Sequence, residues 1–424
     1  MTTRPRAAIV VTGSELVRGD RTDLNGPFLA RELVSLGLEP SRITLVGDRP
    51  DELETAFRDG LTHDLCVVSG GLGPTNDDRT VELLAVAAGL KLKVDPALEA
   101  EIEAVSRGIA QRLRRPYGDF ATGVRKQATL PDGGLSVGMA GTAPGIVVRA
   151  GTSVVVVLPG PPGELRRLWP RALETEQVRD VLGRARPPGR RVLRFYGASE
   201  SAVAKALAEA GGDGDGVEAT ICARDFEIHV DLIVDPDAAE RADELTAGLR
   251  APLERHLFAE DERPIEEIVL ALCRARGLSL VTAESCTGGM IAERLTSVPG
   301  SSDVFRGSVV AYANDVKEKE LGVPVATLEQ HGAVSAETAR AMAEGARKRL
   351  RADIGLAATG IAGPGGETPE KPVGLVYLHA WTPEGDGGLD FSFPADRETI
   401  RRRATVAALH LVRQLLSRNL DDPV

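Results

Sequence analysis

Short apolar runs alternate with amphipathic stretches through the first third of the chain, and this alternation restricts the fold more than any other feature of the sequence. The apolar runs have the length of buried strands, and the intervening stretches repeat apolar residues at helical spacing. The expected strands cover residues 7–12, 42–47 and 65–69, and the expected helices cover residues 25–35, 50–61 and the segment after Asp78. This order predicts a mostly parallel sheet covered by helices, with ligands bound beyond the carboxyl ends of its strands.

A glycine-rich loop, residues 69–80, follows the third expected strand and reads Ser-Gly-Gly-Leu-Gly-Pro-Thr-Asn-Asp-Asp-Arg-Thr. Its glycines lack side chains, so a phosphate can approach the backbone closely. The carboxylates of Asp77 and Asp78 suit a divalent cation that bridges phosphates, although either aspartate could instead cap the next helix. The loop is therefore a candidate site for a nucleotide or diphosphate, with a metal ion at Asp77 and Asp78.

The length of the chain predicts several domains, because 424 residues exceed what one hydrophobic core usually supports. Hydrophobic residues make up 42% of the chain, and the net charge of −11 argues against a dedicated surface for nucleic acid or anionic membranes. The longest aliphatic run, residues 154–158, is too short to span a membrane, and residues 1–11 lack a signal-peptide core. Four scattered cysteines indicate neither a disulfide framework nor a zinc site. We expect a cytoplasmic protein.

A serine lies between an apolar run and a glycine pair in residues 282–289, which read Thr-Ala-Glu-Ser-Cys-Thr-Gly-Gly. Residues 278–281 are apolar like a buried strand, and helical spacing begins at Met290, so Ser285 is expected at a strand-to-helix turn. Backbone N–H groups of residues 286–289 are candidate donors to an oxyanion. Ser285 is therefore either a nucleophile or a plain helix cap, and Cys286 is either a rival nucleophile or a small packing residue.

Two further segments offer partners for this serine. One begins as an expected strand and ends with Tyr312 and Lys317. Neither His331 nor His379 lies in a triad-like pattern, so a serine nucleophile would need Lys317 as its base, with a pKa lowered from about 10.4 by burial or nearby positive charge. Tyr312 is a candidate proton relay. The other segment, residues 358–366, is a glycine-rich loop that either lines a nucleotide pocket or forms an ordinary turn.

Together these segments resemble the nicotinamide mononucleotide amidase (deamidase) family from about residue 262 to residue 417. The resemblance implies that Ser285 is the nucleophile, that Tyr312 and Lys317 assist it, and that no cofactor is needed. The implied reaction hydrolyses the carboxamide of the mononucleotide through an acyl-enzyme to nicotinate mononucleotide and ammonia, in pyridine nucleotide salvage. The residues assigned to substrate binding are Cys286, Thr287, Gly288, Gly289, Asn314, Thr359, Gly360, Gly363, Arg397 and Arg401.

The two arginines of this set lie four residues apart on an expected helix, where basic side chains could meet a phosphate. Taken by themselves, Arg397 and Arg401 fit a solvated basic face slightly better than a phosphate site. The two readings predict different surroundings for the guanidinium groups.

The N-terminal third resembles the molybdopterin-binding domain superfamily, and the whole chain resembles the CinA (competence/damage-inducible protein A) family. The motifs are the glycine-rich loop, Gly-Ser-Glu-Leu at residues 13–16 and Gly-Thr-Ala-Pro-Gly at residues 141–145. The resemblance implies ADP-ribose pyrophosphatase chemistry that depends on Mg²⁺, Mn²⁺ or Co²⁺. Asp23 and Asn25 only partly match the Asn-Thr-Asn of the family. The residues assigned to the nucleotide or diphosphate are Glu15, Gly70, Gly71, Gly73, Thr75, Gly141 and Thr142.

The predicted fold is a multidomain α/β protein with three parts. Residues 1–170 are expected to form a molybdopterin-binding-like three-layer α/β domain, residues 171–260 a small KH-like α+β module, and residues 261–424 an α/β amidase domain. An acidic glycine-rich loop, residues 211–216, makes RNA binding by the middle module unlikely, so we expect it to act as a spacer or in dimerisation. A homodimer is expected, and competence or repair proteins are potential partners. The alternative function is a noncatalytic scaffold that binds a pterin or nucleotide.

Overall fold

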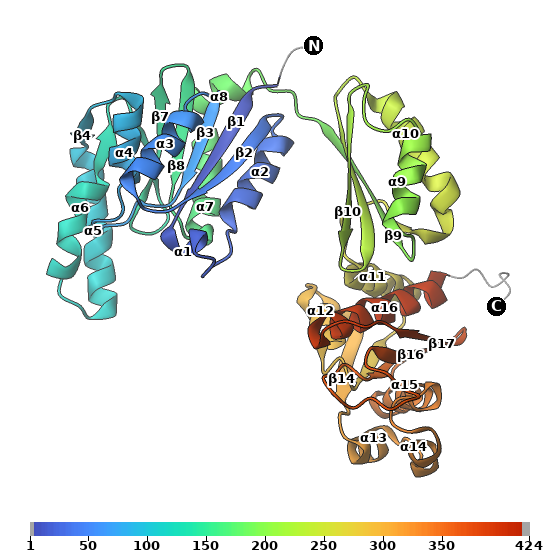
Figure 1. Cartoon of the computed structure of the whole chain (residues 1–424). Helices are drawn as coiled ribbons and strands as arrows, with labels where there is room; N and C mark the ends of the chain where they lie inside the picture. Colours follow the sequence, from blue (N-terminus) through green and yellow to red (C-terminus); the bar gives the residue numbers. More distant parts are fainter. Residues whose placement is uncertain (1–3, 418–424) are drawn as a thin grey trace. The chain divides into compact units, whose positions relative to one another are not determined.

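The computed structural model describes residues 4–417, and the chain forms two compact units (Figure 1). The first unit comprises Met1–Gly189 with Ile233–Ala239, and the second comprises Arg190–Leu232 with Glu240–Val424. The predicted boundary at residue 170 lies within a helix, Pro162–Leu173, that packs in the core of the first unit. The middle module and the C-terminal domain belong to the same unit. Among the described residues, no helix is long and apolar enough to cross a membrane.

The first unit is built on a six-stranded sheet with the strand order β2-β1-β3-β8-β7-β6. Strands β2, β1, β3 and β8 are parallel, and β7 and β6 continue the sheet in antiparallel pairing. A separate pair, β4 and β5, is antiparallel. The strands are β1 (Arg6–Thr12), β2 (Glu39–Val46), β3 (Leu65–Ser69), β4 (Leu92–Val94), β5 (Thr129–Pro131), β6 (Leu135–Met139), β7 (Pro144–Ala150) and β8 (Ser153–Leu158).

Helices cover both faces of this sheet, as the alternation in the sequence predicts (Figure 1). Val10 packs on one face against α3 to α6, and its neighbours Ile9 and Val11 pack on the other against α2, α7 and α8. The helices are α1 (Ser14–Val17), α2 (Asn25–Ser35), α3 (Pro50–Gly60), α4 (Thr80–Ala88), α5 (Pro96–Leu113), α6 (Gly118–Gln127), α7 (Pro162–Leu173) and α8 (Glu176–Leu182). The predicted three-layer α/β domain is confirmed.

The middle module contains a four-stranded sheet in the order β10-β11-β9-β12, accompanied by two α-helices. It is α+β, as predicted. A two-residue turn, Asp225 and Phe226, joins β10 to β11, and both residues have a positive φ. The elements are β9 (Gly189–Tyr196), α9 (Glu200–Glu209), β10 (Val217–Arg224), β11 (Glu227–Val234), α10 (Ala239–Leu253), η1 (Glu254–His256) and β12 (Leu257–Ala259).

The C-terminal domain has a five-stranded sheet in the order β14-β13-β15-β16-β17. Because β14, β13 and β15 are parallel, their carboxyl ends meet at one edge. One face packs against α11, α12 and α16, and the other against α13 and α15. The elements are α11 (Ile265–Arg276), β13 (Leu280–Glu284), α12 (Met290–Ser297), η2 (Ser301–Asp303), β14 (Phe305–Val310), α13 (Asn314–Leu321), α14 (Val325–His331), α15 (Ala336–Leu350), β15 (Ile354–Gly360), β16 (Leu375–Thr382), β17 (Gly385–Ser392) and α16 (Arg397–Ser417).

Helix α16 also contacts the middle module within the second unit. His410 is buried, and its Nε2 lies 2.8 Å from Glu227 Oε1. The His410 ring stacks on the Tyr196 ring with centroids 3.7 Å apart. Nearer the start of the helix, Arg402 donates to Asp225 at 2.5 Å. One helix therefore packs on the C-terminal sheet and on the sheet of the middle module.

Candidate active site

Ser285 and Lys317 meet at the carboxyl edge of the C-terminal sheet. Ser285 directly follows β13, and Lys317 lies in the first half of α13, which follows β14. Both side chains are buried, and that of Lys317 is only 1% exposed. Lys317 Nζ lies 3.1 Å from Ser285 Oγ, 2.8 Å from the carbonyl oxygen of Ala311 and 3.0 Å from that of Tyr312. The structure therefore brings together the predicted nucleophile and the predicted base.

The surroundings of Lys317 favour its neutral form. Burial lowers the pKa of this lysine from its ordinary value. In the neutral amine, two N–H groups satisfy the carbonyl oxygens of Ala311 and Tyr312, and the lone pair remains for the Ser285 hydroxyl. The pair can thus transfer a proton from the serine to the lysine without any histidine.

Cys286 lies next to the nucleophile but differs from it chemically. Its side chain is buried in the hydrophobic core of the C-terminal domain. Burial raises the pKa of the Cys286 thiol to about 12, so the thiolate is not formed near neutral pH. This environment supports the packing interpretation of Cys286 over the interpretation as a rival nucleophile.

Glu284, which the sequence reasoning missed, occupies the start of helix α12. Its fully buried carboxylate accepts hydrogen bonds from the backbone N–H groups of Gly289, Ile291 and Ala292 at 2.9, 3.1 and 2.9 Å. The hydroxyls of Thr282 and Ser308 add two longer bonds, at 3.2 and 3.3 Å. A charged residue at the end of an apolar strand was the signal that could have identified it. Glu284 fixes the turn that carries Ser285.

This arrangement corrects the predicted set of oxyanion donors. The Gly289 N–H donates to the Glu284 carboxylate, and the Gly288 N–H donates to the carbonyl oxygen of Ser285 at 3.1 Å. Over residues 4–417, no oxygen atom accepts a hydrogen bond from the N–H groups of Cys286 and Thr287, and both N–H groups interact with the Cys286 sulfur. The candidate donors are therefore the N–H groups of Cys286 and Thr287 rather than the whole run.

Arg401 reaches the turn that carries Ser285 from α16, whereas Arg397 is exposed and contacts the glycine-rich loop and Tyr312. Arg401 donates to the carbonyl oxygens of Cys286 and Thr287 at 3.1 and 2.8 Å. Arg397 donates to the carbonyl oxygen of Gly363 at 2.6 Å and to the Tyr312 hydroxyl at 2.9 Å. A guanidinium group has five N–H donors, so each arginine keeps donors for a ligand. The two guanidinium groups bring positive charge to this part of the domain.

Tyr312 points away from the serine–lysine pair. Its side chain is 62% exposed, and its hydroxyl accepts from Arg397. Only its backbone carbonyl contacts Lys317. No hydrogen bond among the described residues joins the phenol to Ser285, so the proton relay through Tyr312 stays a prediction without a supporting contact.

The other predicted residues of this site surround the pair or support it. Asn314 begins α13 and is exposed. The buried Thr359 hydroxyl donates to the carbonyl oxygen of Ala333 at 2.7 Å, so it serves the fold. Gly360 has no room for a side chain, since a Cβ would lie 2.8 Å from the carbonyl oxygen of Leu375. Gly288 similarly lets Arg401 approach, because a Cβ there would lie 3.2 Å from the guanidinium group.

In the first unit, most of the residues assigned to a nucleotide or diphosphate line one cavity of about 320 Å³. It lies at the carboxyl ends of β1 and β3, where the sequence predicted a ligand. The assigned residues that line it are Glu15, Gly70, Gly71, Gly73, Asp77, Asp78 and Thr142. Asp48 and Glu164, which the sequence reasoning missed, add two carboxylates.

Two buried hydroxyl groups lie against the glycine loop of this cavity. A Cβ at Gly70 would lie 2.5 Å from Thr12 Oγ1, and one at Gly71 would lie 2.1 Å from Thr80 Oγ1. Within residues 4–417, neither hydroxyl has a hydrogen-bond partner. Thr12 lines the cavity and Thr80 does not, and buried polar groups normally find partners, so the Thr12 hydroxyl points to a polar ligand.

Thr75 and Gly141 support this cavity without lining it. Thr75 donates through its N–H, at 3.0 Å, and its hydroxyl to Asp78, and it accepts from Lys126. A Cβ at Gly141 would lie 2.2 Å from Glu164. Asp23 accepts from the N–H groups at the start of α2, and Asn25 Nδ2 donates to Ser69 Oγ at 2.9 Å.

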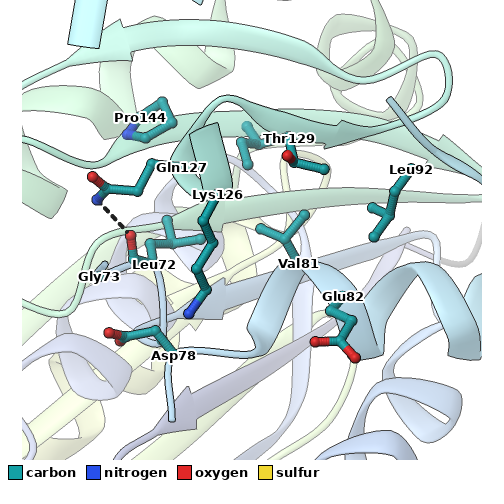
Figure 2. A pocket seen from close by; sticks show the side chains of 12 residues that line it. Leu72, Gly73, Asp78, Val81, Glu82, Leu92, Lys126, Gln127, Thr129 and Pro144 are labelled. Atoms are coloured by element: carbon teal, nitrogen blue, oxygen red, sulfur yellow. Dashed lines mark hydrogen bonds between the residues drawn. The ribbon is translucent and has the colours of Figure 1, made fainter. Parts of the chain in front are cut away.

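The residues for the expected metal ion fit it only in part. Asp78 bonds Thr75 in its own loop, and Figure 2 shows its carboxylate near Lys126, which bonds the same threonine. Among the described residues, no three histidine, cysteine, aspartate or glutamate side chains converge as a metal cluster. Mg²⁺, Mn²⁺ and Co²⁺ need more oxygen ligands than Asp77 and Asp78 provide, so phosphate oxygens or water would have to complete the coordination.

Fold and site together define a class, a multidomain α/β protein with a buried serine–lysine pair in one domain and an acidic, glycine-lined cavity in another. Residues 262–416 match the CinA C-terminal domain model, and residues 8–177 match the probable molybdopterin binding domain model. A CinA-like protein of Mycolicibacterium gilvum is 44% identical over 97% of this chain and 99% of the relative. A CinA-like protein of Mycobacterium tuberculosis H37Rv is 42% identical over 98% of this chain and 99% of the relative. The chain therefore belongs to the CinA family.

Solved structures of this family match parts of the chain. A competence/damage-inducible protein from Agrobacterium tumefaciens is 41% identical and covers 38% of this chain and 100% of its own, with a TM-score of 0.35. A CinA protein of unknown function from Thermoplasma acidophilum is 33% identical and covers 42% of this chain and 98% of its own, with a TM-score of 0.36.

Proposed function

We propose that the C-terminal domain is a nicotinamide mononucleotide amidase, which hydrolyses the carboxamide to a carboxylate and releases ammonia. The contact between Lys317 Nζ and Ser285 Oγ, at 3.1 Å and out of solvent, carries this proposal. A buried lysine without a carboxylate partner serves poorly as a structural cation, because its charge is not compensated. It serves well as a base, because burial lowers its pKa.

The reaction follows from these contacts. Lys317 takes the Ser285 proton as Oγ attacks the carboxamide carbon, and the N–H groups of Cys286 and Thr287 stabilise the developing oxyanion. Lys317 then passes the proton to the leaving nitrogen, the C–N bond breaks and ammonia departs. Neutral again, Lys317 activates a water molecule that hydrolyses the ester. The chain supplies its own nucleophile and base, so no metal is required.

The two arginines suggest how a mononucleotide is recognised. Their remaining N–H donors lie at the edge that carries Ser285, and guanidinium groups bind phosphate through paired hydrogen bonds. We infer that Arg397 and Arg401 bind the substrate phosphate. Amides without a phosphate should therefore be poor substrates.

Ammonia release from nicotinamide mononucleotide by the full chain, with a chelator present, tests this proposal. Ser285→Ala and Lys317→Met should abolish release, while Cys286→Ala should retain it. Inactive wild-type protein would favour the noncatalytic scaffold instead. Loss of wild-type activity in the chelator would contradict the serine–lysine mechanism. Circular dichroism of each variant confirms that it is folded.

We propose as a second function that the first unit cleaves a diphosphate such as that of ADP-ribose. The buried hydroxyl of Thr12 lines the acidic cavity and has no hydrogen-bond partner within residues 4–417, which favours a polar ligand there. A divalent cation would be needed there, because the cavity carries five carboxylates that would repel a diphosphate. Release of AMP from ADP-ribose that depends on an added divalent cation, and that survives Ser285→Ala, is the expected result. If Asp77→Asn releases AMP as fast as the wild-type protein, Asp77 is not a metal ligand of this site.

A further inference from the structure

The turn that joins β10 to β11 in the middle module has a backbone conformation that its residues seldom adopt. Asp225 and Phe226 have φ values of 49° and 65°, both in the left-handed region. Two-residue hairpin turns with a positive φ at both positions are usually built from asparagine, aspartate and glycine. A bulky side chain there is a true outlier, and such outliers gather at sites where function depends on them. The turn alone gives no reason for a phenylalanine, so its contacts must supply one.

Phe226 contacts the C-terminal domain through its ring. This ring meets that of Phe393 edge to face, with centroids 6.2 Å apart. The guanidinium carbon of Arg403 lies 5.6 Å from the ring centroid of Phe226 and 4.0 Å from that of Phe393. It also lies 5.5 Å from the ring centroid of Phe391. A cation within about 6 Å of a ring centroid is attracted by the ring, so three aromatic rings hold one arginine of α16.

Three consecutive arginines of α16 connect this turn with the active site. Arg402 and Arg403 contact the turn, Arg402 through an ion pair with Asp225 at 2.5 Å. Arg401 donates to the carbonyl oxygens of the two residues that follow Ser285, at 3.1 and 2.8 Å. Neighbouring residues of a helix are held together by its backbone hydrogen bonds. A displacement of Arg402 and Arg403 therefore displaces Arg401 as well.

Arg401 acts on the proposed reaction through one peptide group. The carbonyl oxygen of Cys286, which accepts from Arg401, belongs to the same planar peptide group as the N–H of Thr287. A shift of Arg401 therefore changes the direction of this N–H, which is a candidate oxyanion donor. A donor that points away from the developing charge stabilises it less.

We propose that the turn between β10 and β11 is a positioning element of the amidase site, with Phe226 as its central residue. It holds the second turn of α16, so that Arg401 keeps the peptide group after Cys286 in the orientation that the reaction needs. This role rests on the first proposed function. Phe226 acts through Arg401, so it is a positioning residue and not a catalytic one.

Phe226→Gly in the full chain separates positioning from folding. Glycine adopts a positive φ without strain, and Glu227 and His410 still join the middle module to α16, so the melting temperature should stay close to that of the wild-type protein. The variant lacks the ring that packs on Arg403 and Phe393, so kcat/KM for ammonia release from nicotinamide mononucleotide should fall about tenfold or more.

Two further variants are the controls. Phe226→Tyr keeps the ring and should retain the wild-type kcat/KM. Asp215→Gly is the matched control for the glycine, because Asp215 is an exposed residue of the middle module that also has a positive φ, 50°. It should change neither the activity nor the melting temperature.

A double-mutant cycle tests the route through α16. If Phe226 acts through Arg401, Phe226→Gly should lower kcat/KM no further in protein that already carries Arg401→Ala, because the two substitutions remove one interaction chain. An equal loss in both backgrounds would show that Phe226 does not act through Arg401, and the proposal would be wrong.

Other results would also overturn the proposal. Wild-type kcat/KM in Phe226→Gly would show that the turn does not position the site. A loss of activity that Phe226→Tyr shares, or that accompanies a lower melting temperature, would assign Phe226 to folding alone. If the wild-type protein releases no ammonia, the first proposed function fails together with this inference. An active wild-type protein with an equally active Phe226→Gly variant sinks only the inference.

Discussion

Replacing Glu284 by glutamine tests the interpretation of the buried carboxylate as the support of the nucleophile turn. In the native chain both carboxylate oxygens accept, Oε2 from the N–H groups of Gly289 and Ile291 and Oε1 from that of Ala292. A glutamine side chain has one oxygen and one NH₂ group, so at least one of these N–H groups must face another donor. The hydroxyls of Thr282 and Ser308 can rotate and accept a hydrogen bond from the new NH₂ group. A backbone N–H can only donate, so it has no way to adjust to that group.

The cost follows from the number of bonds that cannot be replaced. Leaving one buried donor without its acceptor costs about 1–3 kcal/mol, and the bonds that remain to a neutral amide are weaker than those to a carboxylate. We expect Glu284→Gln to destabilise the second unit by about 2–3 kcal/mol. For a unit of about 150–250 residues this corresponds to a melting temperature lower by about 4–12 °C. Thr282→Val removes one bond of the same carboxylate and should cost about 1 kcal/mol.

Differential scanning calorimetry of the full chain measures these shifts, and ammonia release at 25 °C measures the activity. The expected pattern is a lower melting temperature for Glu284→Gln, a smaller decrease for Thr282→Val, and activity that persists where the variant is folded. A melting temperature within about 1 °C of the wild-type value, combined with lost activity, would refute the reasoning. Glu284 would then act on the substrate instead of on the helix.

Three further predictions concern single groups. Burial lowers the pKa of Lys317, so kcat/KM should rise with pH as this lysine loses its proton, and Lys317→Arg should be inactive at every pH because a guanidinium keeps its proton. Arg397→Ala should raise KM for the mononucleotide by about 10- to 100-fold. Tyr312→Phe should keep most of kcat, because the phenol bonds Arg397 and not the serine. Steady-state kinetics would separate these two effects. Burial lowers the pKa of His410 to about 4, while hydrogen bonds from two histidines outweigh burial and lower that of Glu227 to about 2. In this pH range the unfolded chain therefore binds more protons than the folded chain, so the second unit should lose stability as the pH falls from about 6.5 toward 4. The loss should be smaller in His410→Leu. Urea unfolding at several pH values would measure both effects.

Much of the fold follows from local pattern. The spacing of apolar residues predicts β1, β3, α2 and α3 within a few residues, because each element buries a face that its own sequence defines. The boundary after the first domain was not predictable in this way. Helices α7 and α8 continue to pack on the first sheet beyond residue 170, and that packing depends on residues distant in sequence.

Local sequence likewise predicts some residues of the candidate site, and tertiary packing places the others. Ser285 and Lys317 are recognisable from short motifs, since each follows an expected strand whose carboxyl end reaches the same edge. The placement of Arg397 and Arg401 required the tertiary structure, because their acceptors lie more than a hundred residues away for Arg401 and on another loop for Arg397. Helical spacing on its own cannot tell a basic face that meets water from one that meets a loop.

Helix α16 gives the second unit a thermodynamic link between two places on its surface. Arg401 in its second turn contacts the turn that carries Ser285, and His410 contacts the sheet of the middle module about 14 Å further along the helix. A ligand that favours one position of this helix must favour the matching arrangement of the middle module, and by reciprocity the module must favour the ligand by the same factor. A molecule that binds the middle module and shifts this helix would then change the affinity for a ligand beside Ser285 and Lys317, without touching either residue.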